Sequence, residues 1–109
     1  MLALGPISSI SGSRRFYVDL SPQLDTSELV NGLAITSDNS NIIISSPTIL
    51  AADLTTKSGA VLSANKAVSF RAACSGGDNA ISSIYIDYTT DASNHDITIV
   101  KLRLVPEIL

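Results

Sequence analysis

The chain has 109 residues, which is enough for one domain with a modest core. Seven Lys and Arg residues against ten Asp and Glu residues give a net charge of −3, too few cations for the large cationic face of a duplex nucleic-acid binder. The chain has a single cysteine, which excludes an internal disulfide, and a single histidine, so the two together are too few for a Cys/His zinc site. No apolar run reaches the roughly 18 residues of a membrane span.

The composition favours an all-β protein. Ile and Val together number 19, and Ser and Thr together number 25. β-Branched side chains suit a pleated, half-buried surface, and hydroxyl side chains suit turns and solvent-facing positions. A surface that carries hydroxyl groups in place of charges opposes association only weakly. A partner could therefore cover part of it, although small β domains that stand alone share this composition.

Residues 1–14 predict an N-terminal arm or linker ahead of a single domain over residues 15–109. No basic residue precedes the first apolar residues, and Gly5-Pro6 interrupts the apolar run, so we do not expect a secretory signal peptide. Two interpretations of the segment stay open, a frayed terminus or an arm that docks on a neighbouring subunit. The anchors of a docking arm would be Leu2, Leu4, Ile7 and Ile10.

Alternation with a period of two begins at residue 15 and predicts a first strand that ends at Ser21-Pro22. A second strand is expected over residues 28–37, with Asn31-Gly32 as a bulge or an early turn, and residues 38–41 form a turn cluster. Short strands over 42–45 and 48–55 are expected on either side of Pro47, and a turn follows at 57–59.

The second half of the chain alternates more clearly. Strands are expected over residues 68–74, 84–89 and 98–104, and Pro106 ends the last of them. A loop over 75–79 and a turn over 91–94 separate these strands, which places His95 between two strands.

Seven strands, several of them spaced by 8–12 residues, predict a single immunoglobulin-like β-sandwich of two antiparallel sheets packed face to face. The paired cysteines and core tryptophan of antibody domains are missing, so the prediction covers the architecture alone. Cys74 continues the apolar face of its strand as a small core residue. The other predicted core residues are Phe16, Val18, Leu20, Ile35, Ile43, Val68, Phe70, Ala72, Ile84, Ile86, Val100 and Leu102.

No pattern in the chain indicates a catalytic, cofactor or metal site, and we do not expect an enzyme. His95 is expected to be solvent-exposed, because a catalytic triad needs an oriented imidazole and a buried carboxylate. Asp91, Asn94 and Asp96 are better explained by turn formation than by calcium, whose sites need six to eight ligands in a recognisable loop. Gly76-Gly77 lacks the lysine and the helix of a phosphate-binding loop.

Four exposed positions near the strands are candidate contacts with a partner. Arg14 and Arg15 are the densest basic spot, and they could contact an acidic neighbour or simply be solvated. Tyr17 and Tyr85 are the outward-facing aromatic residues, which would give a carbohydrate-binding module a thin platform.

Three stretches carry a resemblance to a known family: FYVDLSPQLDTSELVNGLAI over residues 16–35, CSGGDN over 74–79, and IYIDYTTDASNHDITIVKLRL over 84–104. In this order they resemble the small immunoglobulin-like proteins of tailed bacteriophages, the fibre–tail adaptor or structural tail proteins. The chain departs from that pattern in having Leu33-Ala34-Ile35 where a tryptophan is often found, and in its longer hydrophobic N-terminus. These departures leave tail, neck and capsid decoration open as places in the virion.

The resemblance implies a structural virion protein without catalytic residues, present in many symmetric copies as a homo- or hetero-oligomer. Its partners would be other virion proteins of the tail, neck, fibre or capsid, and no nucleic acid, membrane or cofactor is expected. Two functions remain as alternatives, a capsid decoration (cement) protein and, from a different class, a carbohydrate- or cell-surface-binding module.

Overall fold

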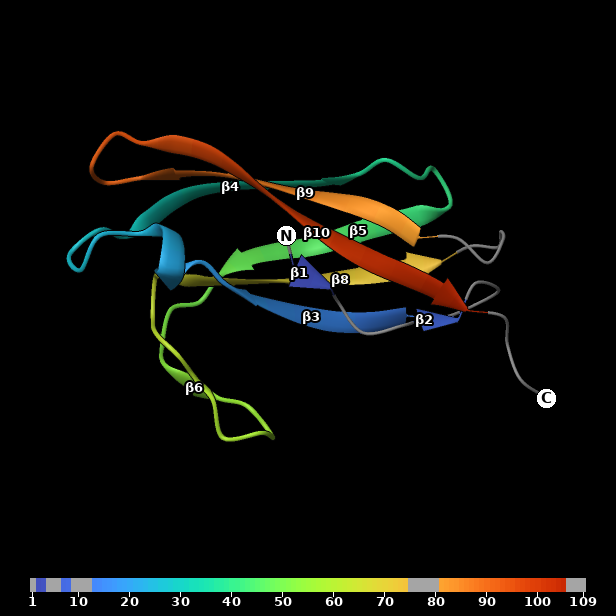
Figure 1. Cartoon of the computed structure of the whole chain (residues 1–109), viewed down its shortest axis with the longest axis horizontal. Helices are drawn as coiled ribbons and strands as arrows, with labels where there is room; N and C mark the ends of the chain where they lie inside the picture. Colours follow the sequence, from blue (N-terminus) through green and yellow to red (C-terminus); the bar gives the residue numbers. More distant parts are fainter. Residues whose placement is uncertain (1, 4–6, 9–12, 75–80, 106–109) are drawn as a thin grey trace.

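Two β-sheets packed face to face make up the fold, which confirms the predicted all-β sandwich (Figure 1). The computed structural model describes residues 2–3, 7–8, 13–74 and 81–105. The first sheet contains β1 (Leu2–Ala3), β2 (Ile7–Ser8), β4 (Val30–Ser37), β9 (Ile81–Thr90) and β10 (His95–Val105). The second contains β3 (Ser13–Asp19), β5 (Ile42–Ile49) and β8 (Ala67–Cys74), while a small hairpin of β6 (Leu54–Thr55) and β7 (Val61–Leu62) forms a ladder of its own.

Both sheets are built mainly from antiparallel pairs. β9 lies between β4 and β10 in the first sheet, and β8 lies between β3 and β5 in the second. β1 and β2 differ from the expected pattern, because each pairs in parallel with β10 of the same chain. Docking of the N-terminal segment on a neighbouring subunit stays a prediction.

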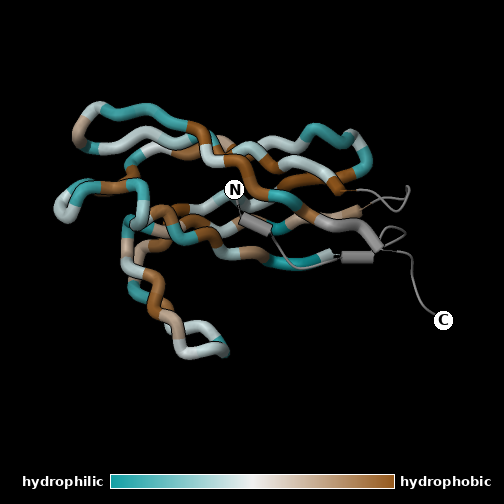
Figure 2. The backbone as a smooth tube through the Cα atoms, in the orientation of Figure 1, coloured by the Kyte–Doolittle hydropathy of each residue, from teal (hydrophilic) through white to brown (hydrophobic). Residues whose placement is uncertain are grey.

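The core lies between the two sheets, where strand residues of one parity point inward. The strands carry alternating hydrophobic and hydrophilic residues, and the turns between β4 and β5 and between β9 and β10 are mostly hydrophilic (Figure 2). Cys74 is a buried free cysteine, as predicted. All predicted core residues except one are buried, namely Phe16, Val18, Leu20, Ile35, Val68, Phe70, Ala72, Ile84, Ile86, Val100 and Leu102.

The exception is Ile43, whose prediction as a core residue is wrong. Its exposed fraction is 54%, whereas Ile42 is buried and Ile44 packs partly against the core. Three consecutive isoleucines carry no alternation, so the sequence could not show which parity of β5 faces inward. Pairing with β8 decides it, because Ile42 and Ile44 stand opposite the buried Cys74 and Ala72.

Proline did not end the strand where the sequence predicted a break. β5 continues through Pro47 to Ile49, and its register with β8 shifts between Ser45 and Thr48. A strand at the edge of a sheet tolerates proline at a bulge, because the missing N–H is not needed by a neighbour. The expected strand over 48–55 is therefore wrong: its first residues extend β5, and its last two form β6.

Other local predictions agree with the structure. The ladder between β4 and β9 shifts register between Val30 and Gly32, which is the predicted bulge. There the two strands approach so closely that a Cβ at Gly32 would overlap the Thr89 hydroxyl. Gly59, with φ of 89°, turns the chain between β6 and β7. The predicted loop at 75–79 and the stop at Pro106 lie outside the described residues, and within those residues no helix is long and apolar enough to cross a membrane.

Candidate interaction surfaces

The outward face of the first sheet carries a row of apolar side chains. On β10, Ile97 is half exposed at 50%, and Ile99 beside it is partly buried. Pairing places Ile99 opposite Tyr85 of β9, and it places Ile97 opposite Asp87, which in turn faces the exposed Ala34 of β4. We call Ile97, Ile99, Tyr85 and Ala34 the outer apolar patch. Exposed apolar side chains gathered on one face of a sheet mark a candidate protein contact surface.

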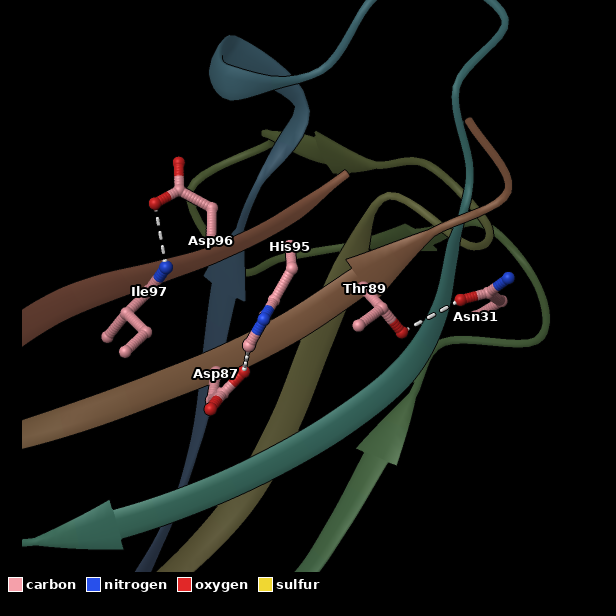
Figure 3. Close-up of polar contacts among 6 residues, drawn as sticks. All are labelled: Asn31, Asp87, Thr89, His95, Asp96 and Ile97. Atoms are coloured by element: carbon pink, nitrogen blue, oxygen red, sulfur yellow. Dashed lines mark hydrogen bonds and ion pairs between the residues drawn. The ribbon is translucent and has the colours of Figure 1, made fainter. Parts of the chain in front are cut away.

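Polar side chains border the patch where β9 turns into β10. His95 Nε2 lies 2.5 Å from Asp87 Oδ1, and the two side chains are 62% and 41% exposed (Figure 3). Asp96 Oδ1 accepts a hydrogen bond from the Ile97 N–H at 2.8 Å. His95 is exposed as predicted, but it is the first residue of β10 and not part of the connecting loop. Asp87 thus places a hydrogen-bonded charge between the two isoleucines and Ala34.

Asp91 and Asn94, two of the residues weighed above as calcium ligands, form hydrogen bonds within the chain. Asp91 Oδ1 accepts a hydrogen bond from the Leu29 N–H at 2.9 Å, and Asn94 Nδ2 donates to Glu28 Oε2 at 2.7 Å. Among the residues that the structure describes, no group of three His, Cys, Asp or Glu side chains is placed to hold a metal ion.

Glu28 connects the loop before β4 to the β9–β10 hairpin. Its carboxylate accepts hydrogen bonds from the Thr90 hydroxyl, the Asn94 amide and the Asp25 N–H, although the residue itself is buried. The Thr90 bond, then the Asn94 bond, then the Asp25 bond lower the pKa of Glu28 below its ordinary value of 4.5, against the opposing effect of burial. The ionised form is therefore the one that the fold stabilises.

Replacing Glu28 by glutamine tests how the hydrogen bonds of this carboxylate change the stability of the fold with pH. A carboxyl group whose pKa is lowered on folding stabilises the fold above its unfolded pKa, and this contribution disappears as pH falls through the folded pKa. We expect the wild-type chain to melt above the Glu28→Gln variant near neutral pH, and the gap to shrink in acid. Thermal melts across acidic and neutral buffers measure it. A gap that stays constant over the whole range would contradict the assignment.

The predicted contact residues do not form one surface. Arg14, Arg15 and the 41%-exposed Tyr17 lie on β3 of the second sheet, whereas Tyr85 is partly buried on the outward face of the first. The two tyrosines therefore cannot share one carbohydrate platform. Leu4 and Ile10 lie outside the described residues, and for Leu2 and Ile7 the structure describes only the backbone strands β1 and β2.

Sequence reasoning missed Ile97 and Ile99, which contribute most of the patch on β10. A signal was present, because residues 97–100 are apolar at both parities except for Thr98. A strand with apolar residues on both faces has either a second layer packed on its outward face or an apolar surface exposed to water.

Comparisons with known proteins do not identify a family. No protein-family model matches the chain, and a search of the curated proteins finds no match.

Proposed function

We propose that the protein is a structural subunit of a bacteriophage virion, a small β-sandwich that joins or decorates other virion proteins. The outer apolar patch is the observation that supports this proposal most directly. A half-exposed isoleucine such as Ile97 loses contact with water when a partner covers it, which favours association. The resemblance of residues 16–35 and 84–104 to phage tail proteins supplies the class of partner.

The patch suits a lasting assembly better than a catalytic or ligand-binding role. Its side chains project from three hydrogen-bonded strands, so the surface is held rigid before a partner arrives. The patch combines apolar side chains with polar ones, Asp87 among them and His95 beside it, and protein interfaces contain both kinds. A subunit of this kind contributes shape and contact area to the particle.

Mass spectrometry of purified virions tests the proposal. We expect the chain to be present in particles of the phage that encodes it, and its absence would overturn the proposal. Quantification against the major capsid protein separates the two virion roles. A copy number that matches a ring at the tail or neck favours an adaptor, and one that scales with capsid positions favours decoration.

Substitution of the patch then tests its role in assembly. The Ile97→Asp variant should be folded in isolation but absent from virions, because an aspartate would bury an unpaired charge in the contact. Ile43→Asp is the matched control, since Ile43 is 54% exposed but lies on the opposite sheet. Incorporation of Ile97→Asp at the wild-type level would exclude the patch as the contact surface.

A further inference from the structure

A cleft separates β3 from the β6–β7 hairpin, which extends away from the sandwich beside β3 (Figure 1). Its volume is about 440 Å³. β3 contributes one wall, and the segment that begins at β6 contributes the other. The lining residues are Arg14, Arg15, Tyr17, Leu54, Thr55, Thr56 and Lys57.

The cleft concentrates positive charge in a chain whose net charge is −3. Arg14, Arg15 and Lys57 line it, and pairing of β3 with β8 places Arg71 directly opposite Arg15. Like charges at opposite positions of two paired strands repel each other, so Arg71 adds to the positive potential beside the cleft. The cleft therefore favours an anionic occupant.

The two opposed arginines bind hydroxyl groups. Arg15 donates to the Ser69 hydroxyl at 3.3 Å, and Arg71 donates to the Ser13 hydroxyl at 3.1 Å. Within residues 13–74 and 81–102, whose side chains the structure describes, neither guanidinium forms an ion pair with a carboxylate. Asp19, the acidic residue of β3, accepts a hydrogen bond from the Ser21 N–H. Among these residues both guanidinium groups therefore have neutral hydrogen-bond partners.

β3 also offers a backbone edge beside these charges. Among the strands of residues 13–74 and 81–105 it is the outermost of its sheet and pairs with β8 along one side only. The other edge presents N–H and C=O groups that an added strand could pair with. A second copy of β3 is a poor candidate for that strand, because it would bring its own Arg14 and Arg15 against the same charges. The charges select a strand of the opposite sign.

We propose that an extended acidic peptide segment of a partner protein binds in this cleft and adds a strand to the open edge of β3. Its backbone pairs with β3, its carboxylates lie against Arg15 and Lys57, and its apolar side chains contact Tyr17 and Leu54. A second copy of this chain is a poor source of such an acidic segment. Most of its described carboxylates already accept hydrogen bonds within the chain: Asp19, Glu28, Asp38, Asp53, Asp87, Asp91 and Asp96.

This inference does not depend on the proposed virion function, because the cleft and the outer apolar patch lie on opposite sheets. Its test uses the purified full-length chain and synthetic peptides. An array of short, β-branched peptides with acidic, neutral and basic substitutions is probed with the labelled protein. We expect acidic sequences to bind. Binding only of neutral or basic sequences, or no binding at all, would overturn the proposal.

Variants of the cleft locate the site. For the best acidic peptide, Arg15→Glu and Lys57→Glu should each weaken binding by roughly tenfold or more, since each replaces a charge-assisted contact with repulsion. Lys101→Glu is the matched control, because Lys101 lies on β10 of the other sheet and donates to the Ser83 hydroxyl. An equal loss in all three variants would mean that net charge alone drives binding.

Amide hydrogen exchange separates strand addition from charge attraction. If the peptide pairs with β3, amides within Ser13–Asp19 become protected when it binds, while those of β9 keep their exchange rates. Saturating binding with no added protection in β3 would overturn the proposed strand addition.

Discussion

The Phe70→Ala variant should lose about 3–5 kcal/mol of its free energy of unfolding, which is a large share of the roughly 5–15 kcal/mol that holds a typical domain folded. Phe70 is fully buried in β8, the central strand of the second sheet. Its ring centroid lies 5.6 Å from that of Phe16, on the paired strand β3. Alanine would remove this contact and leave a cavity between the sheets. Urea unfolding followed by circular dichroism measures the loss.

Ile43→Ala is the control for this substitution. Ile43 lies on β5, which pairs with the same strand β8, but its exposed fraction is 54%. A substitution at such a position changes stability by about 0.5 kcal/mol or less. If both variants lost the same free energy of unfolding, the side chain of Ile43 would point into the core and not toward solvent.

The contrast between Phe70 and Ile43 shows where sequence patterns predict structure and where they stop. In β8 and β9 the apolar residues alternate with Ser, Arg, Tyr and Asp, so each strand has a single way to face the core. Residues 42–44 are all isoleucine, and either parity satisfies the pattern. Only the neighbouring strand decides between them, and the sequence of one strand does not contain that information.

The contact surfaces depend even more on tertiary structure. The sequence predicts Arg14 and Arg15 as contacts because they are its densest basic spot, and Tyr17 because it is an outward-facing aromatic residue. Lys57 was placed only in a turn, yet it lines the same cleft because the β6–β7 hairpin lies beside β3. Arg71 faces Arg15 only through the register of β3 with β8. Cations that are far apart in the sequence thus lie in or beside one cleft once the strands pair.

Gln23 is a second position where a residue distant in sequence completes the fold. It belongs to the 3₁₀ turn Ser21–Gln23, which follows β3. Its side-chain oxygen accepts hydrogen bonds from the Tyr88 hydroxyl at 2.8 Å and from the Thr98 hydroxyl at 2.5 Å. Tyr88 and Thr98 are both buried, on β9 and β10. Burial raises the pKa of Tyr88, so its hydroxyl is protonated at neutral pH and acts as the donor.

Gln23→Ala should therefore lower the free energy of unfolding by about 1–3 kcal/mol, because it removes the acceptor of two hydroxyl groups. A double-mutant cycle with Tyr88→Phe isolates the bond between them. Once the Tyr88 hydroxyl is gone, the same Gln23 substitution should cost less, since one of the two donors no longer needs an acceptor. Strictly additive losses in urea unfolding would mean that the hydrogen bond between Gln23 and Tyr88 contributes nothing to the fold.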